Sequence, residues 1–152
     1  MNWTAAAFAF FAAGAALAIV TGRRPSLCRQ IAHVFALCGA CALGLAGVAG
    51  FGEAVTWEIP SLLPPSGLVL GLDRLSSFFL LLIALGAAPA SVYALEYTRD
   101  YERSHSMAAI GCAFNVFLAA MALVVMAQNV LTFLVSWELM SLASYFLVMT
   151  DH

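Results

Sequence analysis

The sequence contains no lysine, and only 9% of its 152 residues are charged. An ordinary soluble domain has about 25% charged and about 45–50% apolar residues, whereas 64% of this chain is hydrophobic. This composition excludes an ordinary soluble domain and is typical of a membrane protein. The formal net charge of −2 favours neither nucleic acid nor an acidic partner. We therefore expect membrane lipid around the chain and no nucleic-acid partner.

Cysteine is also scarce, and its placement argues against a metal or redox site. The four cysteines, which lie in or beside apolar stretches, are Cys28, Cys38, Cys41 and Cys112. Cys38 and Cys41 form a CxxC pair, which could be a redox or metal pair. In a Gly/Ala-rich helix, however, such residues are more often small packing residues. No further Cys or His follows at metal-site spacing, so we predict no metal and no cofactor.

Five apolar runs are long enough to cross a bilayer, because a ~30 Å hydrocarbon core needs about 20 apolar residues per helix. The predicted fold is therefore all-α and transmembrane, with one membrane domain over residues 1–152. The spans are expected at about 3–20, 31–51, 75–97, 107–127 and 129–150. Positive charge follows the first run instead of preceding it, which favours a retained span over a cleaved signal peptide, the alternative.

The arginines predict the orientation of the spans. Arg23, Arg24 and Arg29 follow the first run, and two more arginines lie in the charged connection at 96–105. Five of the six arginines thus fall on one side, which the positive-inside rule makes cytoplasmic. We expect the N-terminus outside, the C-terminal end inside and an external loop at 52–71. The charges of the connection should be solvated; the alternative is a docking surface for another subunit.

Sequence patterns around the second span predict packing, interfacial and extended segments. A stripe of small residues at spacings of four and three should pack closely against another helix: Ala40, Gly44, Gly47 and Gly50. His33, at the arginine end of this span, is expected to be interfacial and solvated. Short extended pieces are expected around 54–59 and 68–72, where apolar and polar residues partly alternate.

Three polar or helix-breaking residues have predicted structural roles in the third and fourth spans. Asp73 should cap the third span, and Pro89 should kink it. Asn115 is the one strongly polar residue of the fourth span; it makes either a helix–helix hydrogen bond or a supporting contact for a relay. The short connection to the fifth span makes these helices antiparallel neighbours, which places Asn115 and Glu138 at comparable depth.

Glu138 is the one carboxylate in the last apolar run, and the run contains no basic residue. At ~1.5 Å per residue it lies roughly 13–14 Å from residue 129, near the midplane of a ~30 Å core. A charge there costs about 2.5–3.5 kcal/mol, and intramembrane carboxylates are usually functional. We therefore predict a proton relay, with Ser141 and Tyr145 as possible supporting groups on the same face. The alternative is a protonated glutamate with only a structural role.

The phrase Trp137 to Tyr145, WELMSLASY, resembles the fifth transmembrane segment of antiporter-like subunits. This family includes subunits of respiratory complex I, multisubunit cation/proton antiporters and membrane-bound hydrogenases. A weaker match is LDRLS at 72–76, which resembles the phrase that opens the third span. Within the family, this sequence most resembles the hydrogenase-4 component B and formate hydrogenlyase subunit 3 branch. The chain-5 type subunit of complex I is nearly as similar.

This resemblance implies that Glu138 is the family's fifth-helix glutamate, whose charge state responds to a lysine on a later helix. Because this sequence has no lysine, it is expected to be either the N-terminal part of a larger subunit or a split subunit. The resemblance implies proton translocation in a hydrogenase or NADH dehydrogenase-like complex of the bacterial inner membrane, with that complex's membrane subunits as partners.

The chain is expected to be a non-catalytic subunit, since it has no nucleotide loop, Fe–S cysteine pattern or haem motif. The alternative is a small structural or assembly subunit with no transport role.

Overall fold

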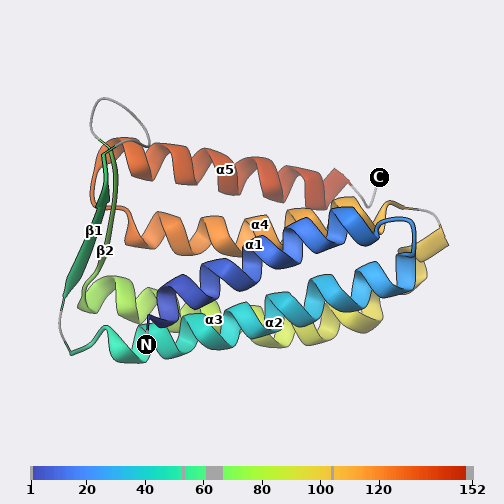
Figure 1. Cartoon of the computed structure of the whole chain (residues 1–152), viewed down its shortest axis with the longest axis horizontal. Coiled ribbons are helices and arrows are strands. Elements are labelled where there is room, and N and C mark those ends of the chain that lie inside the picture. Colours follow the sequence, from blue (N-terminus) through green and yellow to red (C-terminus); the bar gives the residue numbers. More distant parts are fainter. Residues whose placement is uncertain (1, 53, 61–66, 104, 150–152) are drawn as a thin grey trace.

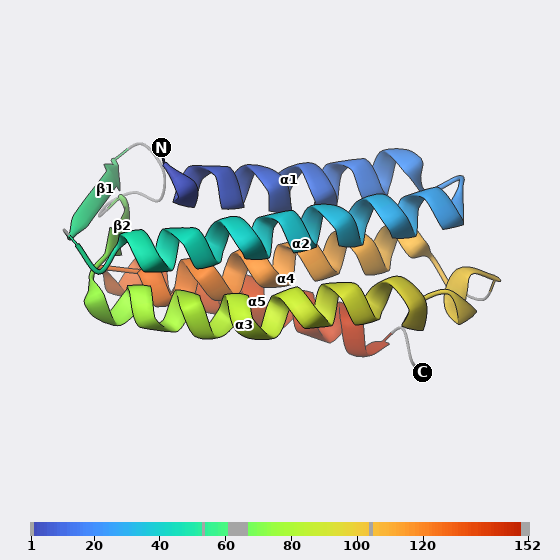
Figure 2. The same ribbon diagram turned by 90° about the horizontal axis from the view of Figure 1, so that it is seen from below.

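The structure is a computed structural model that describes residues 2–52, 54–60, 67–103 and 105–149. Its described residues form five long helices that run side by side in an up-and-down bundle (Figures 1 and 2). The helices are α1 (Trp3–Thr21), α2 (Pro25–Ala49), α3 (Arg74–Tyr97), α4 (Met107–Met126) and α5 (Val130–Met149). All five are long and apolar enough to cross a membrane, so the prediction of an all-α transmembrane fold is confirmed.

The second helix begins at Pro25, earlier than the predicted start near residue 31. Proline is favourable in the first helical turn, because the N–H that it lacks would have no partner there. Arg29 and His33 therefore lie within α2. The prediction of a solvated His33 is wrong, since its side chain is only 2% exposed inside the bundle.

A β-hairpin closes one end of the bundle, on the left in Figure 1. Strands β1 (Val55–Ile59) and β2 (Leu68–Leu72) pair antiparallel, in the register Val55 to Leu72 and Ile59 to Leu68. Both extended pieces predicted from the sequence are thus confirmed. The β2 strand also bonds the α4–α5 connection, because the Gln128 N–H donates to the Val69 carbonyl at 3.0 Å.

The small-residue stripe of α2 faces α3, which confirms the predicted close packing against another helix. A Cβ atom at Gly47 would lie 2.9 Å from both the Ser77 carbonyl oxygen and the Leu81 Cγ. Only glycine leaves room for so close an approach of the two backbones. Cys38 and Cys41 lie instead on the exposed face of α2. The prediction that they are packing residues is therefore wrong for this bundle.

The start of α3 has the predicted cap. The Asp73 carboxylate accepts a hydrogen bond from the Ser76 N–H at 2.7 Å, and this bond lowers the pKa of Asp73. The helix continues through Pro89, which lies on its exposed side. A kink at this residue stays a prediction.

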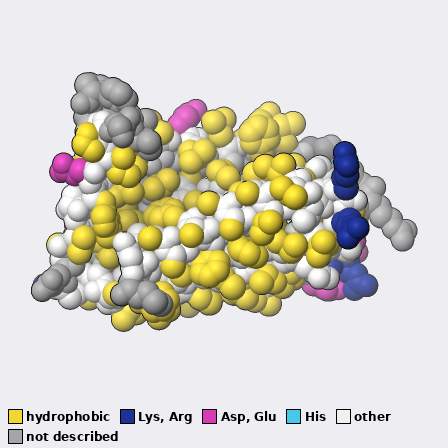
Figure 3. Space-filling model, in the orientation of Figure 1, with side chains coloured by type: hydrophobic (Ala, Val, Ile, Leu, Met, Phe, Trp, Pro, Cys, Tyr) yellow, Lys and Arg dark blue, Asp and Glu magenta, His cyan; other side chains and the backbone are white. Residues whose placement is uncertain are grey.

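The charged end of the bundle lies opposite the hairpin and contains the α1–α2 turn and the α3–α4 connection (Figures 1 and 3). This connection includes the short 3-10 helix η1 (Asp100–Arg103). Its charges are not all solvated: the Arg29 Nε lies 2.6 Å from the Glu102 Oε1, with side chains only 11% and 22% exposed. In contrast, the pair Arg99 to Glu96 is exposed. Which side of a membrane this end faces stays a prediction.

Candidate functional site

Helix α5 lies at the edge of the bundle and packs mainly on α4 (Figure 1). Its N-terminal end is held by hydrogen bonds to described residues of the hairpin and of its own first turn. The Asn129 Oδ1 accepts from the Thr132 N–H at 2.7 Å, and the Asn129 Nδ2 donates to the Gly67 carbonyl at 3.1 Å. The Thr132 Oγ1 accepts from the Val69 N–H of β2 at 3.0 Å. These bonds determine which side of α5 faces the bundle.

The packed side of α5 is a narrow stripe at spacings of four, four, three and four residues. Its members are Thr132, Ser136, Met140, Ala143 and Leu147, of which Thr132, Ser136 and Ala143 are buried. Such spacing places side chains on one helix face. The small and hydroxylated members at this contact allow α4 and α5 to approach closely.

Glu138 lies on the other side of α5 and is exposed. It is two residues from both Ser136 and Met140, which at about 3.6 residues per turn is roughly 160–200° around the helix. The same side, which we call the Glu138 face, carries Leu134, Glu138, Ser141, Leu142 and Tyr145, all exposed. The predicted grouping of these residues on one face is therefore present. Within the described chain, no other helix covers this face.

The Glu138 carboxylate forms no hydrogen bond or ion pair with any described residue. Ser141 instead donates to the Trp137 carbonyl oxygen at 3.0 Å, a local helical bond. The Tyr145 ring contacts Phe146, with ring centroids 5.8 Å apart. The supporting roles of Ser141 and Tyr145 stay predictions, because neither side chain bonds Glu138 in this structure.

Asn115 lies on the α1–α2 side of α4, away from the Glu138 face. Its side chain is fully buried, and its Nδ2 donates to the carbonyl oxygens of Ala32 on α2 at 3.0 Å and Gly111 at 2.9 Å. The predicted helix–helix hydrogen bond is present. The structure does not bring Asn115 together with Glu138, so a role for Asn115 in supporting that carboxylate stays a prediction.

His33 is a buried polar residue for which the sequence analysis predicted the wrong environment. Its Nε2 lies 3.3 Å from the Thr98 Oγ1 at the end of α3, and its ring lies 5.2 Å from the Phe114 ring of α4. The spacing of residues in α2 could have predicted the burial of His33. His33 lies three residues before Ala36 and seven before Ala40, on the same helix face as the small-residue stripe.

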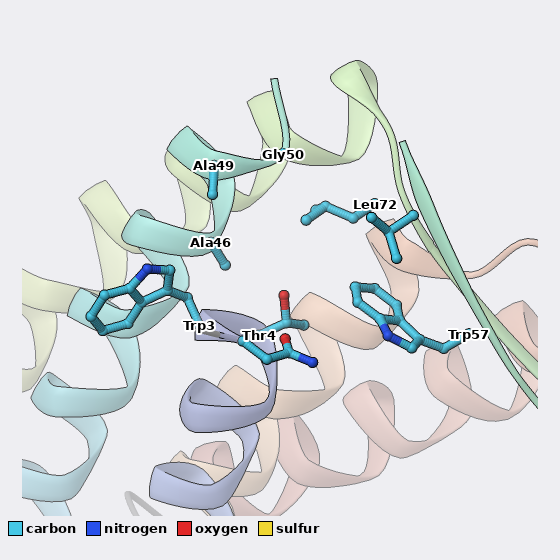
Figure 4. Close-up of a pocket in the computed structure, with 9 residues that line it drawn as sticks. Trp3, Thr4, Ala46, Ala49, Gly50, Trp57 and Leu72 are labelled. Carbon is cyan, nitrogen blue, oxygen red and sulfur yellow. The ribbon is translucent and has the colours of Figure 1, made fainter. Parts of the chain in front are cut away.

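Among the hollows lined by the described residues, two are mainly apolar. One, of about 330 Å³, lies beside the hairpin between Trp3, Trp57 and Leu72 (Figure 4). Asn2 and Thr4 contribute its polar groups, and none of its lining residues is an acid or a base. The other, of about 700 Å³, lies between α4 and α5 and is lined by residues such as Cys112 and Phe146. Neither hollow contains Glu138.

The described residues include no cluster of three or more His, Cys, Asp or Glu side chains that could hold a metal ion. The chemistry of the candidate site is therefore that of one carboxylate on an uncovered helix face. Such a group can bind and release a proton, and its protonation responds to the charge of whatever covers the face.

Comparisons with known proteins identify several relatives. Hydrogenase-4 component B of Escherichia coli (strain K12) is 42% identical over 81 residues, which cover 53% of this chain and 12% of that protein. NADH-quinone oxidoreductase subunit L of Mycobacterium tuberculosis is 31% identical over 147 residues, which cover 90% of this chain and 23% of that protein. An uncharacterised protein of Mycobacterium tuberculosis is 39% identical over 114 residues, 75% of this chain and 17% of that protein. No family model matches.

Proposed function

Because this chain belongs to the antiporter-like subunit family, as its hydrogenase-4 and NADH-quinone oxidoreductase relatives indicate, we propose that it contributes to proton translocation in a redox complex of that kind. The chain spans 12% to 23% of the length of these relatives. We propose that the rest of the subunit, either a continuation of this polypeptide or a separate chain, covers the Glu138 face. Other membrane subunits of the complex would be its partners.

The observation that carries this proposal is the position of Glu138, in the middle of α5 and opposite the side that packs on α4. A charged carboxylate at the bilayer centre costs about 2.5–3.5 kcal/mol on insertion scales. Such side chains almost always face a bundle interior or a water-filled cavity. The Glu138 face is therefore the side of α5 on which we expect further protein.

In the proposed mechanism Glu138 takes a proton at its carboxylate oxygen and later releases it. A lysine ammonium on a covering helix would favour the ionised carboxylate, and loss of that positive charge would favour the protonated form. The lysine must come from outside this sequence, which has none. Electron transfer would belong to other subunits.

We further propose that the charged end of the bundle faces the cytoplasm of a bacterial inner membrane. The arginines of the α1–α2 turn and the α3–α4 connection support this orientation by the positive-inside rule. The N-terminus and the hairpin would then lie on the outer side.

Replacing Glu138 with glutamine in the complete complex tests the proposal, because glutamine keeps the shape and removes the titrating group. We expect the complex to assemble and its proton-pumping rate to fall at least about tenfold. General acid–base groups contribute about 10²–10⁴-fold to the rates of the steps that they catalyse. The pumping assay is quenching of a pH-sensitive dye in inverted membrane vesicles, with sodium salts exchanged for potassium salts to identify the ion.

Glu138→Asp is the matched control, since it keeps a titrating carboxylate at the same position. It should keep most of the wild-type pumping rate. If Glu138→Gln pumps normally, the relay is refuted and a structural subunit with a static, protonated Glu138 is supported. If both variants lose pumping equally, the loss is not specific to the carboxylate, which also contradicts the relay.

A further inference from the structure

His33 lies inside the membrane bundle, about 12 Å along the α2 axis from Pro25. Its side chain is 2% exposed and is surrounded by α2, the C-terminal end of α3 and α4. Burying a polar group in apolar surroundings costs free energy unless its hydrogen bonds are made. An ionisable side chain at such a position is a functional candidate by default.

The hydrogen bonds around Thr98 indicate which nitrogen of His33 carries the proton. The Thr98 Oγ1 lies 2.6 Å from the Ala94 carbonyl oxygen and 3.3 Å from the His33 Nε2. A hydroxyl group has one hydrogen, and the carbonyl can only accept, so that hydrogen is donated to Ala94. The Thr98 oxygen therefore accepts from Nε2, and Nε2 carries the proton.

The other nitrogen, His33 Nδ1, is then the basic position of the neutral ring. It is buried, and no described residue forms a hydrogen bond with it. A buried nitrogen lone pair without a protein donor is a site that a proton can occupy, alone or delivered by a water molecule.

Burial and the Arg29 guanidinium disfavour a charged His33 ring, and contacts around the ring offset part of this cost. On α2, Arg29 lies one turn towards the charged end, and the Glu102 carboxylate of η1 pairs with it at 2.6 Å. This pairing offsets the repulsion between the guanidinium and an imidazolium. On α4, the Phe114 ring centroid lies 5.2 Å from the His33 ring, within the ~6 Å reach of a cation–π contact. On α3, Thr98 is an uncharged acceptor.

Polar groups extend from the charged end to the depth of His33 in the bundle. The Arg29–Glu102 pair lies at the end of the bundle, His33 lies one turn deeper, and Ala32 beside it accepts the bond from Asn115. The Asn115 Oδ1 is also buried without a hydrogen-bond partner among the described residues. Asn115 is eight residues from Met107 and His33 is eight residues from Pro25, so the two side chains lie at about the same depth, on the α1–α2 side of α4 and away from the Glu138 face.

We propose that His33 is a second proton-binding site of this subunit, loaded from the charged end. Loading forms one N–H bond at Nδ1 with a proton from water at that end, unloading breaks the same bond, and nothing is oxidised or reduced. Proton binding follows from the site itself. Its part in transport rests on the proposed function.

Proton binding is tested by nitrogen NMR of the assembled complex with its 15N-histidine-labelled chain, using His33→Asn to assign the signal among the three histidines. Because burial and the Arg29 guanidinium disfavour a charged ring, we expect His33 to change from a ring protonated at Nε2 alone to a doubly protonated ring on the acid side of the range of about pH 5 to 8 in which histidines usually titrate. A His33 signal that stays neutral down to the lowest pH at which the complex remains assembled, while another histidine titrates, would overturn the proposal.

Transport is tested in inverted vesicles with His33→Asn and Thr98→Val, the latter removing the acceptor of Nε2–H while keeping His33. His33→Asn should reduce proton pumping at least tenfold. Thr98→Val should move the midpoint of the pumping pH profile to lower pH by about one unit, because a hydrogen bond to a charged group is then lost. Ser91→Ala is the matched control, since Ser91 makes the same buried bond to Ala87, at 2.7 Å, and should leave the profile unchanged.

The outcomes separate this inference from the proposed function. If Glu138→Gln stops pumping while both His33→Asn and Thr98→Val leave the rate and pH profile unchanged, the His33 role in transport is refuted and the Glu138 relay stands. If Glu138→Gln pumps normally, the Glu138 relay fails, and the NMR titration still decides whether His33 binds a proton. If His33→Asn does not assemble, the Thr98→Val profile decides the transport role.

Discussion

Replacing Gly47 with alanine should weaken the contact between α2 and α3. The added Cβ would lie 2.9 Å from both the Leu81 Cγ and the Ser77 carbonyl oxygen. Leu81 can rotate away, but the Ser77 oxygen belongs to the backbone, so the helices themselves must shift. Overpacking costs about 1–3 kcal/mol, while alanine gains about 0.8–1.0 kcal/mol over glycine in helix propensity. The net expectation is a loss of up to about 2 kcal/mol.

Gly86→Ala is the matched control, because no heavy atom lies within 4 Å of a Cβ at that position of α3. Gly86→Ala should gain only the helix-propensity stabilisation and no steric cost. The two variants should therefore differ by about 1–3 kcal/mol in their free energy of unfolding. The measurement is reversible unfolding in mixed micelles with increasing SDS, followed by circular dichroism. If Gly47→Ala is as stable as Gly86→Ala, the small-residue stripe does not set the distance between α2 and α3.

Two further predictions concern charged residues near the bundle ends. Asp73→Ala should destabilise the chain by about 0.5–2 kcal/mol through loss of the α3 cap. Because the Ser76 N–H holds the pKa of Asp73 below its ordinary value, the carboxylate's contribution is complete at neutral pH and disappears as pH falls through that lowered pKa. Unfolding measured against pH should show this acid loss in the wild type and not in Asp73→Asn, which keeps a cap and does not titrate. Glu102→Gln should cost about 1–3 kcal/mol, less than the ~3–5 kcal/mol of a fully buried pair, because it leaves Arg29 without its counter-ion. The double variant Arg29→Met/Glu102→Gln should recover part of this loss in the same unfolding assay, and no recovery would contradict a stabilising pair.

Local patterns predicted much of the fold, because each depends on a short stretch of sequence. Partial alternation on both sides of a proline-rich segment predicted two extended pieces, and the second strand occupies Leu68–Leu72, as predicted. The pairing of the two pieces into a hairpin was not predicted. The spacing of the small residues predicted that Gly47 packs closely against another helix, but not that this helix is α3. The shared face of Glu138, Ser141 and Tyr145 followed from their spacing, whereas the exposure of that face was not predicted.

The errors occurred where the answer depends on which helices meet. His33 was expected in solvent because α2 was predicted to start late, and its burial depends on α3 and α4, which are distant in sequence. Cys38 and Cys41 lie in a Gly/Ala-rich helix, where such residues usually pack against a neighbouring helix, but they are on the exposed side of α2. Asn115 shares its helix hairpin with Glu138, yet it bonds α2, since chain connectivity does not determine which face of α4 each helix covers.

The hydrogen bonds between the β-hairpin and the start of α5 have a mechanical consequence. Val69 is held on both sides, by Gln128 at 3.0 Å and by Thr132 at 3.0 Å. Rotation of α5 about its axis would break these bonds, so the hairpin prevents the helix from rotating. The direction in which Glu138 points from the α5 axis is thereby fixed. Its carboxylate can reach a new partner when its own side chain rotates or when the partner approaches, and α5 does not need to turn.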